Sequence, residues 1–232
     1  MLKLYIGNKN YSSWSMRPWV LLTQAGIPFE EVMVRFDSFD AQSQFKKTMA
    51  TISPTGKVPA LVDTSVDGGL KIWDTLAIAA YLAETFPEKN LLPKDKAARA
   101  TARSVCAEMH AGFTGLRSHC AMNIEASLPE IGQLVWRDQA SVRADMARLI
   151  ELWGGLLEKY QGPMLFGDFS VADAFFTPVC MRINTYQLPV PDTIAAYVAR
   201  VTALPSVRQW IQEALLEKDF VVMDEPYRVK AA

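Results

Sequence analysis

The sequence is poor in cysteine and has no framework for pairing its thiols. Its 232 residues include 3 cysteines, Cys106, Cys120 and Cys180, which are scattered and form no Cys-x-x-Cys pair. An odd, scattered set argues against the disulfide framework of a secreted protein and against a thiolate zinc site. We therefore expect a protein that needs no metal.

Clusters of one charge and long apolar runs are also missing. The 24 basic and 25 acidic residues leave a formal net charge of -1, and Lys46-Lys47 is the only adjacent basic pair. Because nucleic acids and anionic membranes attract accumulated positive charge, we expect neither as a partner. No stretch approaches the ~20 apolar residues that cross a bilayer, and the first residues resemble no signal peptide. These absences predict a cytoplasmic protein.

What is present is the composition of a globular protein, with 50% hydrophobic and 21% charged residues, in a chain long enough to bury a full core. The beginning of the chain alternates short apolar runs with helical patterns, and Asp67-Gly68-Gly69 is a hairpin signal. The predicted order is β-α-β-α-β-β-α, with strands near 2–6, 28–34, 60–63 and 70–72 and helices near 15–26, 42–48 and 75–86.

A boundary follows, where Pro87 and Pro93 bracket a segment that cannot continue a helix. Beyond it the apolar spacing is helical over 96–122, 141–160, 171–186, 192–203 and 206–217. The sequence therefore predicts an α/β domain at 1–86, a linker at 87–95 and an all-helical domain at 96–232. A cleft is expected where the two domains meet.

Three short motifs carry chemistry, and the first is the turn from 11 to 17 between the first strand and the first helix. It holds Ser12, Ser13 and Ser15 but no cysteine. Backbone N–H groups at a helix start favour an anion, and a serine hydroxyl can donate to a thiolate. Thiol chemistry at this turn would need a thiol brought by a small molecule. The alternative is that Ser12 or Ser13 only caps the helix.

The other two motifs are polar groups at the edges of the predicted sheet. Lys57 precedes Val58-Pro59, a peptide bond that is a candidate for the cis form, and Lys57 could hold a carboxylate. Asp74 and Thr75 stand where a strand ends and a helix begins, so the pair suits the ammonium and carboxylate of an amino acid. An ordinary loop and a helix cap are the simpler alternatives.

Together these motifs resemble the cytosolic glutathione transferase family, over essentially the whole chain. The run Ser12-Ser13-Trp14-Ser15-Met16-Arg17 is most similar to the zeta-class pattern Ser-Ser-Cys-Ser-Trp-Arg, with Trp14 in place of its cysteine. The arginine that holds the dicarboxylate substrate in that class has no counterpart in register, since Arg182 is only nearby. The resemblance implies a thioredoxin-like domain followed by a helical domain, a homodimer, and a role in detoxification.

The resemblance also implies the roles of single residues toward glutathione. Ser12 is the favoured residue for activating its thiol, with Ser13 beside it. The remaining contacts fall to Lys57 for the glycyl carboxylate, Val58 and Pro59 for the cysteinyl backbone, and Asp74 with Thr75 for the γ-glutamyl head.

The helical half should supply the pocket for the second substrate. His110 and Arg117 are seven residues apart and would share one helix face, so they are expected to line this pocket with Trp14. His119 would point to the opposite side, which excludes a two-histidine metal site on that helix. Ser170 and Asp173 have the spacing of a capping box and are assigned a folding role only.

The expected activity is therefore that of a glutathione transferase, which attacks an electrophilic small molecule with the glutathione thiolate. A glutathione-dependent isomerase of the maleylacetoacetate type is one alternative. A non-catalytic regulatory or binding protein with the same fold is another, and a thiol reductase would normally need a cysteine between Ser12 and Ser15.

Overall fold

The computed structural model describes residues 1–38 and 40–230, and its first part is built on a four-stranded sheet. The strands are β1 (Leu2–Ile6), β2 (Phe29–Met33), β3 (Ala60–Asp63) and β4 (Leu70–Trp73), in the spatial order β2-β1-β3-β4. β2 runs parallel to β1, whereas β3 and β4 are antiparallel to their neighbours. The buried side chains of Leu2, Leu4 and Ile6 alternate along β1, as expected for a strand in the middle of a sheet.

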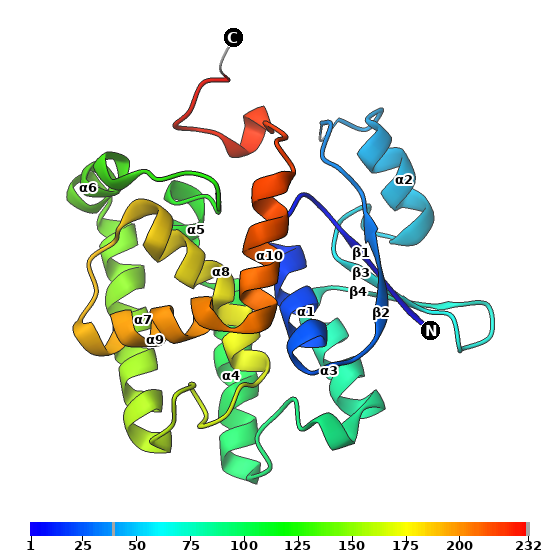
Figure 1. Ribbon diagram of the computed structural model, residues 1–232, viewed down its shortest axis with the longest axis horizontal. Helices are drawn as coiled ribbons and strands as arrows, with labels where there is room; N and C mark the ends of the chain where they lie inside the picture. The colour runs from blue at the N-terminus through cyan, green and yellow to red at the C-terminus, as the bar shows by residue number, and fades with distance from the viewer. Residues whose placement is uncertain (39, 231–232) are drawn as a thin grey trace.

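Three helices cover this sheet. α1 (Ser13–Gln24) and α3 (Thr75–Thr85) lie between the sheet and the rest of the molecule, and α2 (Gln44–Ile52) lies on the far side (Figure 1). Pro18 falls in the early part of α1, where a missing N–H is tolerated. The order β1-α1-β2-α2-β3-β4-α3 is the one that the sequence predicted, and it is a thioredoxin-like arrangement.

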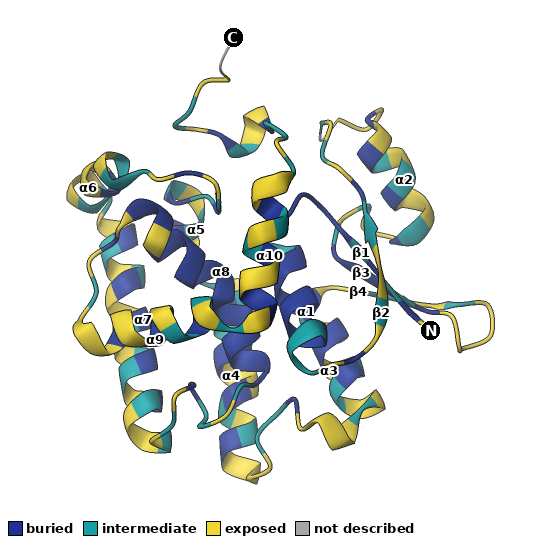
Figure 2. Cartoon of the chain, in the orientation of Figure 1, coloured by how far each residue is buried: buried dark blue, intermediate teal, exposed yellow. Residues whose placement is uncertain are grey.

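The second part is helical. A 3-10 turn at Pro87–Lys89 leads into α4 (Lys96–Ala111), and the helices that follow are α5 (Thr114–His119), α6 (Pro129–Asp138), α7 (Ala140–Tyr160), α8 (Val171–Tyr186), α9 (Asp192–Ala203) and α10 (Pro205–Leu216). α8 runs through the centre, and every one of its residues except Asn184 is buried (Figure 2). A further 3-10 turn, Val222–Asp224, lies in the C-terminal segment.

The two parts share one hydrophobic core, because α1 packs against both α8 and α10. Leu4 and Met16 from the first part belong to the same buried cluster as Trp153 and Phe175 from the second. The turn that begins α1 is therefore held between the sheet and the helical part, where a cleft was expected.

One expectation about the helices was wrong, and one helix was missed. The helix predicted over 96–122 is broken into α4 and α5, because Gly112 ends α4 and Phe113 adopts a left-handed backbone with φ of 54°. α6 was not foreseen, although Pro129 at its start is a typical first residue of a helix. Within the described residues, no helix combines the length and the apolar character that a membrane crossing requires.

Candidate active site

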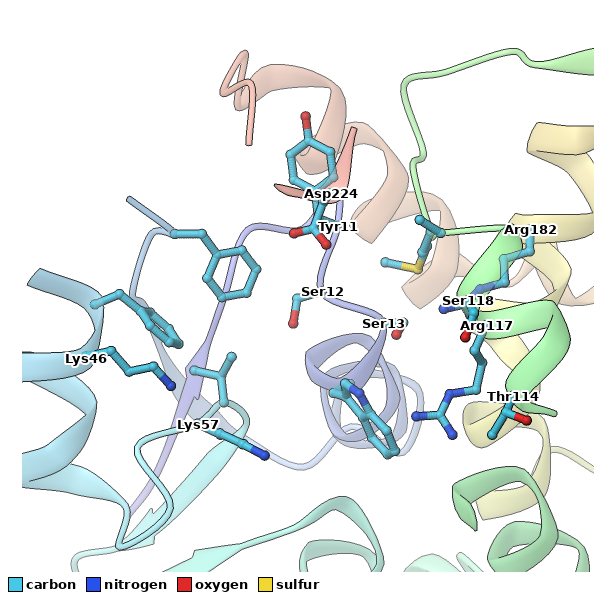
Figure 3. A pocket seen from close by; sticks show the side chains of 16 residues that line it. Tyr11, Ser12, Ser13, Lys46, Lys57, Thr114, Arg117, Ser118, Arg182 and Asp224 are labelled. Atoms are coloured by element: carbon cyan, nitrogen blue, oxygen red, sulfur yellow. The ribbon is translucent and has the colours of Figure 1, made fainter. Parts of the chain in front are cut away.

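Two adjoining cavities open where the sheet meets the helical part. The larger has a volume of about 560 Å³ and the smaller about 420 Å³. Both are lined by Trp14, Lys57, Val58 and Arg117, so they form one continuous site. In the larger cavity, Ser12 and Ser13 lie between two lysines on one side and Arg117 on the other (Figure 3).

The start of α1 places Ser12 at this cavity. Its side chain accepts a hydrogen bond from the Ser15 N–H at 3.4 Å and donates one to the Ser15 Oγ at 2.7 Å. Ser15 Oγ in turn accepts from the Gly7 N–H at 3.1 Å. Ser12 therefore caps the helix and also lines the cavity, so the two roles considered from the sequence are compatible. Ser13, the first residue of α1, is half-buried and lines the cavity too.

Tyr11 precedes these serines, but its hydroxyl serves a different purpose. It donates to Glu225 Oε1 at 2.7 Å and contacts the Asp219 carbonyl at 3.0 Å, both in the segment after α10. The hydroxyl points away from Ser12 (Figure 3). Burial raises the pKa of Tyr11 to about 12, with the Glu225 hydrogen bond acting in the same direction. The Tyr11 hydroxyl therefore anchors the turn before α1 to the C-terminal segment, a role that its sequence position did not reveal.

The loop before β3 supplies the lysine side of the site. The Val58–Pro59 peptide bond is cis, as its position had suggested. Lys57 and Val58 line both cavities, whereas Pro59 lines the smaller one. Lys46 on α2 also lines the larger cavity and donates to the Gly56 carbonyl at 3.3 Å, a second cation that sequence reasoning missed.

Asp74 and Thr75 begin α3 at the smaller cavity. Asp74 has a φ of 74°, and its Oδ1 caps the helix by accepting from the Leu76 N–H at 2.8 Å. Its other oxygen lies 3.1 Å from Nε2 of His110, and the Thr75 hydroxyl lies 3.4 Å from Nδ1 of the same ring. Thr75 is buried, whereas the Asp74 side chain is 43% exposed.

The position of His110 corrects the expectation that it shares a helix face with Arg117. Because the chain turns at Gly112 and Phe113, His110 lies in the last turn of α4 and lines the smaller cavity beside Asp74, not the larger one. Arg117 stands on α5 and lines both cavities. The two residues still meet, since the Arg117 guanidinium donates to the His110 carbonyl at 3.2 Å.

Arginines gather around Trp14. The Arg17 guanidinium lies 4.1 Å from the centre of the Trp14 ring, and that of Arg117 lies 4.9 Å from it. Arg17 is 1% exposed, and its Nε and Nη1 atoms have no hydrogen-bond partner in the described part of the chain. Burial, with Arg182 and Arg117 nearby, lowers the pKa of Arg17 to about 9. Such a group of buried like charges favours an anion beside it.

Arg182 completes this group from α8. It is buried, lines the larger cavity and donates to the carbonyls of Cys120 and Pro178 at 2.8 and 3.3 Å. Burial lowers its pKa to about 10, with Arg117 adding to the effect. The sequence placed Arg182 near the site but out of register with the family arginine.

The protein's own thiols line neither cavity. Cys106, Cys120 and Cys180 are all buried and unpaired. Burial raises the pKa of Cys106 and of Cys120 to about 12, so neither is a thiolate near neutral pH. Among the described residues, no cluster of histidine, cysteine, aspartate and glutamate side chains could hold a metal ion.

The role assigned to Ser170 and Asp173 matches their surroundings. Ser170 caps α8, and Asp173 accepts from both the backbone and the hydroxyl of Ser170. Asp173 also accepts from the Leu165 N–H at 3.1 Å and the Tyr197 hydroxyl at 3.0 Å, deep in the helical core. Both residues lie outside the two cavities.

Comparisons with known proteins identify the family. The model of the glutathione S-transferase N-terminal domain matches residues 11–85. The chain is 40% identical to "Glutathione S-transferase Z2" of Arabidopsis thaliana over 219 residues, covering 88% of this chain and 91% of the relative. It is 29% identical to "Probable maleylacetoacetate isomerase" of Caenorhabditis elegans over 217 residues, covering 87% and 92%.

Solved structures show the same fold. A glutathione transferase homologue from Burkholderia gl BGR1, solved with bound glutathione, superimposes with a TM-score of 0.66 at 25% identity. The match covers 92% of this chain and 97% of that one. The chain thus belongs to the glutathione S-transferase family and is similar to zeta-class members, as the resemblance had implied.

Proposed function

We propose that the protein binds glutathione and activates its thiol for attack on an electrophilic small molecule. The observation that carries this proposal is the position of Ser12, whose hydroxyl lies at the positive end of α1 and faces a cavity of about 560 Å³. A bound thiol at this point would lose its proton more easily, because a hydroxyl and a helix start both stabilise the sulfur anion. The glutathione in the Burkholderia homologue supports the same ligand.

The charges around the site match those of the tripeptide. Lys57 would bind the glycyl carboxylate, and the backbone of Val58, with Pro59 behind it, would pair with the cysteinyl residue. Asp74 would bind the γ-glutamyl ammonium, and Thr75 the adjoining carboxylate. These groups line the cavity from Lys57 to the start of α3, and Ser12 lies in the adjoining one.

The chemistry then requires no thiol of the protein. The glutathione thiol releases its proton to solvent water. The Ser12 hydroxyl then turns its hydrogen from the Ser15 Oγ to the resulting thiolate, and the Ser15 hydroxyl can donate to Ser12 in return. In a transfer reaction the thiolate forms a carbon–sulfur bond and the leaving group departs with its electron pair. In an isomerisation the same thiolate adds to a double bond, a single bond rotates, and the thiolate leaves again.

The second substrate is expected to be anionic. Arg117 and Arg182 line the larger cavity, and Arg17 lies behind it against Trp14, with two buried nitrogens that lack partners in the described part of the chain. A carboxylate bound here would offset the repulsion between these guanidinium groups. The same observation favours the second candidate function, isomerisation of a maleylacetoacetate-type dicarboxylate, as does the similarity to the Caenorhabditis elegans isomerase.

The assembly and location are also part of the proposal. The free edge of the sheet at β4 exposes Leu70 and Trp73, which supports a homodimer. We place the protein in the cytoplasm, in a detoxifying role, with domains at 1–86 and 96–232 joined by 87–95.

Calorimetry with glutathione, followed by a conjugation assay with an aromatic halide, tests this function. Binding together with conjugation supports a transferase. Binding without turnover on aromatic halides or on unsaturated dicarboxylates would instead favour the non-catalytic alternative. The absence of both heat and thermal stabilisation at millimolar glutathione would overturn the proposal.

A further inference from the structure

One imidazole contacts both residues that the proposed function gives to the γ-glutamyl head. His110 Nε2 lies 3.1 Å from Asp74 Oδ2, and its Nδ1 lies 3.4 Å from the Thr75 hydroxyl. A carboxylate only accepts, so the Nε2 atom carries the hydrogen that points to Asp74, and Nδ1 faces the Thr75 hydroxyl. His110 comes from α4, whereas the other two residues begin α3, so the helical part reaches into the expected head site.

Folding stability alone gives little reason for this contact. The His110 side chain is 25% exposed and that of Asp74 is 43% exposed, and pairs this exposed contribute about 0–1 kcal/mol. His110 also lines the cavity of about 420 Å³, so a ligand in that cavity can reach it. Trp14 packs against the imidazole, edge to face, with 5.0 Å between ring centres, which holds the ring toward Asp74 and Thr75.

We propose that His110 is a third residue of the γ-glutamyl site and takes up a proton when the ligand binds. The inference rests on the proposed binding of glutathione. The γ-glutamyl carboxylate of the ligand accepts the hydrogen bond of the Thr75 hydroxyl. The Nδ1 atom of His110 therefore no longer accepts a hydrogen bond from Thr75. A proton on Nδ1 then gives the ligand carboxylate a second, charged donor, while Nε2 still donates to Asp74.

The charges that face His110 explain why the proton comes with the ligand. Asp74 at the start of α3 favours the imidazolium, whereas Arg117 on α5 opposes it, and Lys57 lines the same cavity. Before the ligand binds, Asp74 is the carboxylate in contact with the His110 ring. The γ-glutamyl carboxylate adds a negative charge on the other side of the ring, which shifts the balance toward the charged form.

Calorimetry with S-methylglutathione isolates this proton, because the methylated ligand has no thiol to ionise. We expect the binding heat near pH 7 to depend on the ionisation enthalpy of the buffer, with a net uptake of up to about one proton by the unaltered protein. His110→Gln should lose this uptake and bind about ten- to a hundredfold more weakly, as expected for one charged hydrogen bond. His119→Gln, at the only other histidine, is the matched control and should change neither quantity.

A ligand without the head separates this role from a structural one. S-methyl-cysteinylglycine should bind the unaltered protein and His110→Gln with the same affinity. NMR of the unaltered protein adds a readout that needs no variant, since S-methylglutathione should shift the ring signals of His110 and leave those of His119 in place.

Equal affinity and equal proton uptake in His110→Gln would overturn the inference and leave the proposed function intact. An equal loss for both ligands would also overturn it, since the effect would then be structural. An unaltered protein that binds no S-methylglutathione and no glutathione would instead refute the proposed function itself.

Discussion

Replacing Ser12 by alanine tests the centre of the proposed mechanism. The change removes the hydroxyl that lines the larger cavity and also the cap that accepts from the Ser15 N–H. A hydrogen bond to a charged group contributes about 1.5–3 kcal/mol, so turnover should fall about ten- to a hundredfold. The same energy corresponds to a rise of about one to two units in the pKa of the bound glutathione thiol.

The loss of the cap is a smaller and separable effect. An N-cap contributes about 1 kcal/mol, which for a chain of this size lowers the melting temperature by about 2–4 °C. The protein should therefore stay folded at assay temperature. Glutathione affinity should persist, because Lys57, Val58, Asp74 and Thr75 remain.

The decisive assay is the pH dependence of conjugation, combined with the ultraviolet absorbance of the bound thiolate. In Ser12→Ala both should move to higher pH, and turnover should recover partly under alkaline conditions. Ser13→Ala is the matched control, since Ser13 lines the same cavity but does not cap α1. A fully active Ser12→Ala together with an inactive Ser13→Ala would refute the reasoning and exchange the two roles.

Further changes test the electrophile pocket, the helical core and the C-terminal segment. Arg117→Ala should raise the KM for anionic electrophiles about tenfold and leave the KM for neutral electrophiles unchanged, since only anionic electrophiles lose a charged partner. Unchanged kinetics of the variant with every anionic substrate would contradict this prediction. Asp173→Ala removes the acceptor of three buried donors, the Leu165 N–H, the Ser170 N–H and the Tyr197 hydroxyl. It should lower the free energy of unfolding, measured by urea titration, by about 3 kcal/mol or more. Ser170→Ala, which removes only a helix cap, should lower it by about 1 kcal/mol. Burial, with Glu225 adjacent, raises the pKa of Asp224 to about 6, so the folded protein holds this proton between about pH 4 and 6 where the unfolded chain has lost it. Stability should therefore fall as the pH rises through that window, and melting curves of Asp224→Asn should lack this decline.

Local sequence was enough for the parts of the site that depend on neighbouring residues. Ser12 and Asp74 cap the helices that directly follow them, and Val58–Pro59 lies in the turn that leads into β3. Caps and prolines act within a few residues, so their positions can be predicted without the fold. The order of strands and helices in the first part followed from apolar spacing for the same reason.

The rest of the site depends on contacts between distant segments. The predicted helix over 96–122 ignored Gly112 as a stop signal, and this one break takes Arg117 off the helix that carries His110 and leaves His110 beside Asp74. Arg17 and Arg182 stand on different helices, and only the packing of α1 against α8 brings their charges together. The spacing of residues along the chain cannot predict that these two side chains lie close together.

The tie between the first loop and the last segment affects how the protein is made. The Tyr11 hydroxyl bonds Glu225, 214 residues further along, and the Lys9 N–H bonds Glu217 at 2.7 Å. A chain emerging from the ribosome has the serine turn early but lacks these anchors until residues 217 and 225 have been synthesised. The turn therefore acquires its contact with Glu217 only 208 residues after Lys9 has been made, and a nonsense codon shortly before residue 217 would leave the turn without these anchors.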